Sequence, residues 1–134
     1  MLKTKTSLRV RYSETDKMGV VYHANYAQYF EVARTEMFRE IGLAYSDMEA
    51  NGIMLPLVDL YCRYHKPAYY DDNLTIEVTV EEMPSVKIKF NYKIYNEKGD
   101  LLTDGYTTLV FIDMKTNRPT RMPEYIKQVV EKYF

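Results

Sequence analysis

Apolar and polar residues alternate in several stretches of the chain, which is the pattern of half-buried β-strands. A further stretch, beginning at Ile53, is strand-like, and Pro56 predicts a bend or a sheet edge there. The stretch of residues 101–114 is more continuously apolar than the others, which predicts the central strand of a sheet. Short polar links containing M-P-S and N-E-K-G-D indicate hairpins. The alternating stretches cover residues 6–12, 74–81 and 86–94, and the more continuously apolar stretch covers residues 101–114.

A helical period marks the segment from Asn25 to Ile41. Asn25 is placed as an N-cap, and Gly42 stands where a left-handed residue ends a helix. Glu31 and Arg34 lie off the apolar stripe, which predicts a surface pair one turn apart. The stripe consists of Tyr26, Phe30, Ala33, Met37 and Ile41.

Two shorter helices are also predicted. Ser46 and Glu49 have capping-box spacing, so one helix should run to Asn51. Pro123 opens the other, near the end of the chain. The predicted inward face of that last helix is Ile126, Val129, Val130 and Tyr133.

One long early helix followed by a mostly antiparallel sheet of about five strands indicates an α+β protein. The 134 residues suit one domain, residues 1–134, with no linker or repeat. A single helix covers only one face of such a sheet and leaves its edges open. We therefore expect a homo-oligomer. The 14 tyrosines, without any tryptophan, fit this expectation because tyrosine combines a buried ring with a polar boundary.

Composition excludes several classes of function. The net charge is −1 and the charges are interspersed, so we expect no nucleic-acid partner. No apolar run is long enough to span a bilayer, and the first ten residues lack the apolar core of a secretion signal, which predicts a cytoplasmic protein. His23, His65 and Cys62 form no recognisable ligand set, so we expect no metal. Cys62 is predicted to be a small packing residue.

The candidate chemistry lies between Tyr12 and Tyr26. Asp16 falls in a turn near the flexible Gly19, and His23 comes just before the long helix. Unpaired N–H groups at a helix N-terminus suit an oxyanion, and a nearby carboxylate can act as base or nucleophile toward the same carbonyl. A turn or cap role for Asp16 is the simpler interpretation, and spacing alone favours it.

The run T-D-K-M-G-V-V-Y-H-A-N-Y, followed by E-V-A-R-T-E-M, resembles the 4-hydroxybenzoyl-CoA thioesterase family of hotdog-fold proteins. It is most similar to the bacterial acyl-CoA thioesterase branch associated with the Tol–Pal system. The resemblance continues through P-L-V, Y-H-K-P-A-Y-Y-D-D and the meander, and so covers nearly the whole chain. It implies a hotdog fold, in which a five- to six-stranded antiparallel sheet wraps around the long helix, and active sites at a dimer interface.

The resemblance also implies roles for individual residues. Asp16 matches the family's catalytic aspartate, Tyr12 and His23 match further site residues, and the backbone amide of His23 matches the group that polarises the carbonyl. Lys17 and Met18 depart from the residues that some relatives place there, which affects pocket shape and acyl preference. The residues expected around the substrate are Gly19, Val20, Tyr22, Asn25 and Tyr26.

Thioester hydrolysis of an acyl-CoA is the implied reaction, with coenzyme A entering only as part of the substrate and no other cofactor. Lys87 and Lys89 alternate on one strand face; a solvated face is the simpler interpretation, and coenzyme A phosphates are the functional one. An acyl carrier protein as the substrate's carrier stays open, as does a homodimer or a homotetramer. A non-catalytic acyl-thioester-binding protein has no need of Asp16, and H-A-N-Y does not resemble hotdog hydratases or dehydratases.

Overall fold

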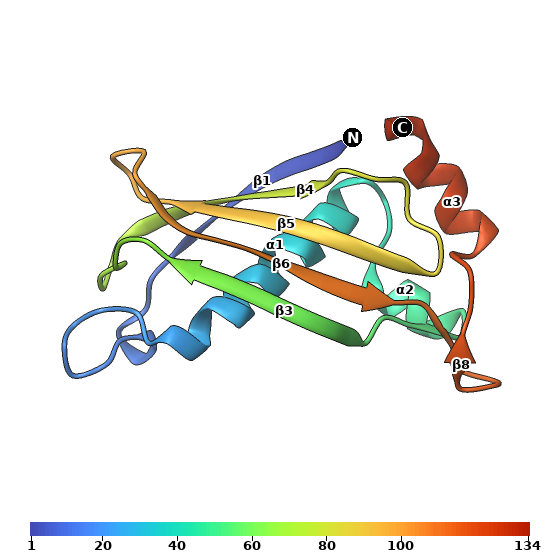
Figure 1. The fold of residues 1–134 in the computed structure, drawn as a ribbon, viewed down its shortest axis with the longest axis horizontal. Helices are drawn as coiled ribbons and strands as arrows, with labels where there is room; N and C mark the ends of the chain where they lie inside the picture. The colour runs from blue at the N-terminus through green and yellow to red at the C-terminus, as the bar shows by residue number, and fades with distance from the viewer.

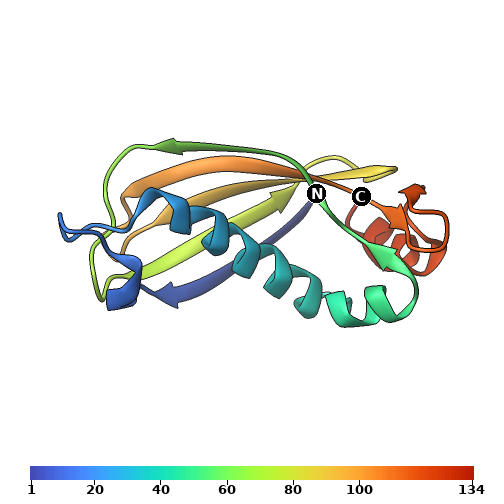
Figure 2. The same cartoon turned by 90° about the horizontal axis from the view of Figure 1, so that it is seen from below.

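Five antiparallel strands form one sheet in the order β1-β4-β5-β6-β3. The structure is a computed structural model that describes all residues from Met1 to Phe134. The long helix α1 (Tyr26–Glu40) lies across one face of this sheet, and the opposite face carries no helix (Figures 1 and 2). This is the predicted hotdog arrangement of a sheet around one helix. The strands are β1 (Leu2–Arg9), β3 (Leu57–Tyr64), β4 (Asn73–Val80), β5 (Lys87–Tyr95) and β6 (Leu101–Val110).

The remaining elements cluster around the ends of the sheet. A second, three-stranded sheet has the order β2-β7-β8. Helix α2 follows α1, and α3 closes the chain beside the N-terminus (Figure 1). The elements are α2 (Tyr45–Ala50), α3 (Glu124–Val130), β2 (Ile53–Met54), β7 (Ile112–Asp113), β8 (Arg118–Pro119), and the single-turn 3-10 helices η1 (Tyr12–Glu14), η2 (His23–Asn25) and η3 (Glu131–Tyr133).

The core lies between α1 and the sheet. Phe30, Ala33 and Met37 of α1 are fully buried, as the helical stripe predicted. The ring of Phe30 stacks on that of Tyr92 in β5, with centroids 4.2 Å apart and an angle of 8° between the planes. Every second residue of β4 and β5 is buried because successive strand side chains point to opposite faces.

Two predictions about strands are wrong in position. The first strand is Leu2–Arg9 rather than residues 6–12, because its backbone pairs with β4 from Leu2↔Val80 to Arg9↔Asn73 and the chain then leaves the sheet. The last long strand, β6, is not central, because β5 occupies the middle of the sheet and β6 lies between β5 and β3. The apolar run at residues 109–112 spans the junction between β6 and β7.

The helix-capping predictions also need correction. The side chain of Asn25 does not cap α1, because its Nδ2 donates to the carbonyl oxygen of Glu14 at 2.8 Å. Helix α2 begins at Tyr45 without a side-chain cap from Ser46. Gly42 has φ +89°, so its predicted left-handed position after α1 is confirmed.

Two side-chain predictions on helices are wrong. Arg34 is half-buried and forms no ion pair with Glu31, because its side chain turns toward the phenols of Tyr45 and Tyr92. In the C-terminal region Ile126 and Val130 are buried, but Tyr133 lies beyond the end of α3 and is exposed.

Strand β3 is an open edge of the sheet. Its apolar side chains are unusually exposed, at 42% for Leu60 and 51% for Tyr64, because α1 packs mainly against β1 and β4. Unpaired edge strands of this kind invite pairing with another chain. No helix has the length and apolar composition needed to cross a membrane.

Candidate active site

The segment that joins β1 to α1 is tied down by backbone hydrogen bonds to residues 68–72. The amide of Val10 donates to the carbonyl oxygen of Asp72 at 2.9 Å, and the amide of Val21 donates to that of Ala68 at 2.8 Å. Val20 forms a β-bridge with Tyr69. The loop between these ties is therefore held at the end of α1 (Figure 1).

Glu14 organises this loop from within, although it was not among the residues predicted for the site. Its side chain is only 8% exposed. Its carboxylate accepts hydrogen bonds from the backbone and guanidinium of Arg11, at 2.8 to 3.2 Å, and from the hydroxyl of Tyr29 at 3.0 Å. Its carbonyl oxygen accepts from the amide of Tyr22 and the side chain of Asn25. A glutamate three residues after an arginine was the only sequence signal for this role.

Asp16 lies in the turn that the sequence predicted. Its Oδ1 accepts a hydrogen bond from the amide of Met18 at 2.8 Å, which is the Asx-turn arrangement. The amide of Gly19, which has φ +79°, donates to the carbonyl oxygen of Asp16 at 3.0 Å. The second carboxylate oxygen, Oδ2, forms no hydrogen bond within the chain. The turn role of Asp16 therefore uses one carboxylate oxygen and leaves the other available.

The start of the long helix lies across a cleft from this turn. The 3-10 helix η2 runs directly into α1, and the amides of His23 and Ala24 donate no hydrogen bond within the chain. The hydroxyl of Tyr64, at the end of β3, donates to the carbonyl oxygen of His23 at 3.1 Å. These two free N–H groups stand at the positive end of a helix dipole.

A cleft of about 320 Å³ brings the predicted residues together. Asp16, His23 and Tyr26 line it from the loop and helix side. The opposite wall comes from the end of β3 and the segment after it, whose residues were not among those predicted for the site. The full lining is Asp16, Val20, Val21, His23, Tyr26, Tyr64, His65, Lys66 and Pro67.

Asp16 also borders a second, more open hollow of about 610 Å³. Tyr12, Tyr22 and Asn25 line this hollow, whereas they do not line the cleft with His23. Tyr12 is 77% exposed, and its ring meets that of Tyr70 edge-on with centroids 5.6 Å apart. Gly19 lines neither space and serves the turn.

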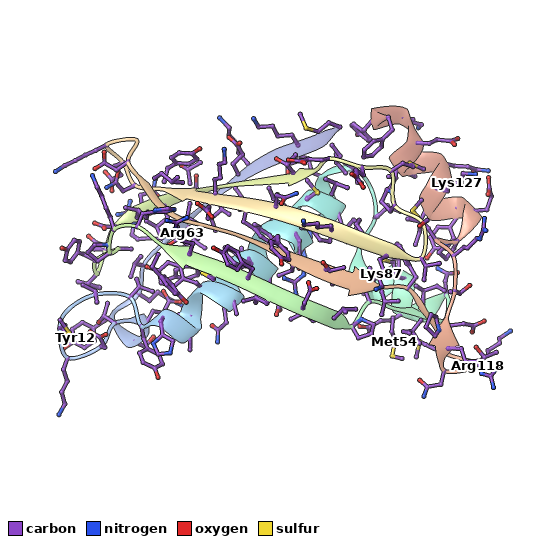
Figure 3. All side chains as sticks on the ribbon, in the orientation of Figure 1. Tyr12, Met54, Arg63, Lys87, Arg118 and Lys127 are labelled. Carbon is purple, nitrogen blue, oxygen red and sulfur yellow. The ribbon has the colours of Figure 1, made fainter.

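Lys87 and Lys89 do not join these residues within one chain. Figure 3 shows Lys87 and Tyr12 at opposite ends of the molecule. Both lysines are exposed on the uncovered sheet face, and the Nζ of Lys89 lies 4.2 Å from the centroid of the Tyr106 ring. Strand alternation correctly placed them on one face, but it carried no information about their distance from Asp16.

Other charged residues near the cleft have partners of their own. The Nε2 of His65 lies 2.6 Å from Oδ2 of Asp104, and the Nζ of Lys66 lies 3.7 Å from Oδ2 of Asp100. The pKa of the Cys62 thiol is raised by burial, which keeps it protonated and fits packing better than nucleophilic attack. No group of three or more His, Cys, Asp or Glu side chains is arranged to hold a metal ion.

Comparison with known proteins agrees with this arrangement. Residues 10–130 match the thioesterase-like superfamily. The acyl-CoA thioester hydrolase YbgC of Escherichia coli (strain CFT073) is 32% identical over 119 residues, 89% of each chain. YneP of Bacillus subtilis, named as a candidate acyl-CoA thioesterase, is 37% identical over 87% of this chain and 84% of its own.

Comparison with solved structures also finds a thioesterase. A DHNA-CoA thioesterase from Staphylococcus aureus superposes with a TM-score of 0.91 and 41% sequence identity, covering 99% of this chain and 89% of its own. The family match spans most of the chain, and the relatives extend over nearly its full length. The chain therefore belongs to the thioesterase-like superfamily of hotdog-fold proteins.

Proposed function

We propose that this protein is an acyl-CoA thioesterase that hydrolyses a thioester to a free acid and coenzyme A. One observation carries the proposal: Asp16, whose Oδ2 is free, and His23 at the start of the helix, whose backbone amide is unpaired, line the same cleft. A nucleophile or base facing an oxyanion-stabilising group is what acyl transfer requires.

The thioester carbonyl oxygen accepts hydrogen bonds from the amides of His23 and Ala24 as negative charge develops on it. Loss of one such donor costs about 3 kcal/mol of transition-state stabilisation in other enzymes. In the nucleophilic route, Oδ2 of Asp16 bonds to the carbonyl carbon, the C–S bond breaks, and water then hydrolyses the mixed anhydride. In the general-base route, Asp16 takes a proton from the attacking water and returns it to the departing thiolate. Both routes give the same products.

His23 and Tyr12 have supporting roles in this proposal. The imidazole of His23 is exposed beside the ring of Tyr22, with centroids 4.4 Å apart, and can orient a water in the cleft. Tyr12 lines the second hollow, which Asp16 also lines, and its hydroxyl is proposed to orient Asp16 or the water. Gly19, Val20, Tyr22, Asn25 and Tyr26 shape the walls of these two spaces or the turn between them.

The named relatives support the reaction class, since they include acyl-CoA and DHNA-CoA thioesterases. Within the superfamily, we propose that the chain belongs to the 4-hydroxybenzoyl-CoA thioesterase family and to its Tol–Pal-associated branch. That placement rests on the motif around Asp16 and His23.

The proposed assembly is a homodimer, or a homotetramer built from it. The exposed apolar edge of β3 supports pairing with a second copy. A second copy would also be needed if Lys87 and Lys89 are to meet the coenzyme A phosphates of an Asp16 site, because one chain keeps them apart. Gel filtration at moderate salt tests this, and a clean monomer would overturn it.

Release of free thiol from a panel of short, long and aromatic acyl-CoAs tests the activity. Turnover of at least one substrate is the expected result. Tight acyl-CoA binding without turnover of any of them would support a non-catalytic binding protein instead. Turnover restricted to the same acyl groups on acyl carrier protein would identify that carrier as the partner.

A further inference from the structure

The wall of the candidate active-site cleft that follows β3 is held to β6 by few backbone contacts. The pairing of the two strands ends at Tyr64. Beyond it, the amides of His65 and Lys66 both donate to one carbonyl oxygen, that of Leu102, at 2.8 and 3.1 Å. The next residue, Pro67, has no N–H group to donate. The wall therefore leaves the sheet with little backbone support, and side-chain contacts carry more of its attachment.

His65 and Asp104 form such a side-chain contact between the wall and β6. Nε2 of His65 lies 2.6 Å from Oδ2 of Asp104. A carboxylate oxygen only accepts hydrogen bonds, so Nε2 carries the hydrogen. The two side chains are 31% and 34% exposed, whereas every other ion pair of the chain has a member that is at least 47% exposed. Partial burial of both groups reduces screening by solvent and strengthens the contact.

Two cationic residues on the neighbouring strands do not compete with His65. Arg63 of β3 and Lys93 of β5 stand opposite Asp104 in the strand register. Neither forms an ion pair with it, and its one ion-pair partner is His65. The carboxylate of Asp104 is therefore committed to the wall of the cleft.

This wall carries two contacts that reach the reacting groups. Immediately before His65, the hydroxyl of Tyr64 donates to the carbonyl oxygen of His23 at 3.1 Å. Three residues after His65, the carbonyl oxygen of Ala68 accepts from the amide of Val21 at 2.8 Å. Figures 1 and 2 show the end of β3 at the same end of the molecule as the loop before α1. An anchor at His65 therefore fixes both the helix start and that loop relative to the sheet.

We propose that His65 and Asp104 are positioning residues for thioester hydrolysis, holding the wall that aligns the helix-start amides with Asp16. The reaction that the pair serves rests on the proposed function, whereas the positioning of the amides does not. Alignment of the reacting groups matters most in the transition state, so its loss slows the chemical step more than it weakens substrate binding. The pair should therefore affect kcat and leave KM nearly unchanged.

Free-thiol release by the full-length protein, on the best acyl-CoA of the panel, tests the pair. His65→Ala and Asp104→Ala should each lower kcat per folded molecule about tenfold, with KM within about twofold of the wild type. His65→Gln, whose Nε2 can still donate to Asp104, should keep kcat within about threefold of the wild type. Lys3→Ala removes another cross-strand ion pair, that with Glu77 at 3.1 Å, and should change neither constant.

Two kinetic results would overturn the proposal. One is a loss of stability in both alanine variants without any change in kcat per folded molecule, which would make the pair merely structural. The other is equal impairment by His65→Gln and His65→Ala, which would assign the effect to the imidazole itself. If an alanine variant does not fold, Asp104→Asn, which keeps an acceptor and loses the charge, replaces it and should lower kcat about threefold.

NMR of the backbone amides tests the positioning without turnover. The His23 and Ala24 signals should shift in His65→Ala and Asp104→Ala, and should stay in place in His65→Gln and Lys3→Ala. A wild type that hydrolyses no acyl-CoA would overturn the proposed function, while these shifts would still decide the positioning. Unshifted His23 and Ala24 amides in both alanine variants would overturn it.

Discussion

The hydroxyl of Tyr29 on α1 donates a 3.0 Å hydrogen bond to Oε1 of Glu14 in the loop that precedes the helix. Through this contact the helix holds the turn that presents Asp16. Burial raises the pKa of the Glu14 carboxyl, but the hydrogen bonds from Arg11 and Tyr29 outweigh burial, so the pKa lies below its ordinary value of 4.5. Glu14 is thus ionised in the folded protein at neutral pH.

Replacing Glu14 by Gln should destabilise the protein at pH 7 by about 2 kcal/mol, because charge-assisted hydrogen bonds become neutral ones. A carboxyl whose pKa is lowered by folding stabilises the protein above its unfolded pKa, and this contribution is lost as pH falls through the folded pKa. The difference between wild type and Glu14→Gln should therefore shrink below about pH 4.5. Urea unfolding across pH 3 to 7 measures it, with exposed Glu81→Gln as the control. A difference that stays constant with pH would contradict the assigned role.

Tyr64→Phe should impair activity more than stability. The hydroxyl of Tyr64 donates to the carbonyl oxygen of His23 and so fixes the backbone turn that carries the proposed oxyanion amides. Loss of one neutral hydrogen bond predicts a decrease in kcat/KM of about threefold to tenfold. Since the side chain is half-exposed, the unfolding midpoint in urea should hardly move. Tyr69→Phe, on a nearby exposed tyrosine with no side-chain hydrogen bond, serves as the control, and equal effects of the two variants would count against the role of Tyr64.

Gly105→Ala should unfold the sheet locally or shift β3. A Cβ at this position would lie 2.2 Å from the carbonyl oxygen of Tyr61 and 3.1 Å from the ring of Phe30. Neither atom has room to retreat, because one is strand backbone and the other is fully buried. We expect destabilisation of about 2–3 kcal/mol, measured by thermal or urea unfolding. Thr108→Ala, three positions further along β6, should cost much less, and a wild-type melting temperature for Gly105→Ala would refute the packing described.

Much of this fold could be predicted from residue periodicity. The stripe of α1 and the alternation in β4 and β5 are local patterns that tertiary packing preserves. The start of β1 was missed because Lys3 and Lys5 face solvent and Thr4 and Thr6 are only half-buried, which leaves a weak alternation. Strand order depends on contacts between distant segments, so no local pattern could show that β5 is central.

The candidate site, like the fold, could be predicted from the sequence only where its residues are close together along the chain. The motif from Asp16 to Tyr26 identified one wall of the cleft because its residues are close in sequence. The opposite wall, including Tyr64, comes from residues about forty positions away and has no local signal. The hydrogen bond from Tyr29 to Glu14 also has no local signal in the sequence. Nor could a local pattern show that Tyr12 and Lys87 lie at opposite ends of the molecule. Asn25 shows the reverse case, where a side chain typical of an N-cap bonds to a distant carbonyl instead.

The central claim is that the charge of Asp16 performs chemistry beyond its role in the turn. Asp113 provides a matched control, because its Oδ1 accepts a hydrogen bond from the amide of Lys115 at 2.9 Å, in the same type of turn. Asparagine preserves this acceptor at both positions and removes only the negative charge. The decisive measurement is kcat for free-thiol release by Asp16→Asn, Asp16→Ala and Asp113→Asn on the best acyl-CoA of the panel. We predict a fall of about 100-fold or more for both Asp16 variants and near wild-type activity for Asp113→Asn; wild-type rates for both Asp16 variants would contradict the account.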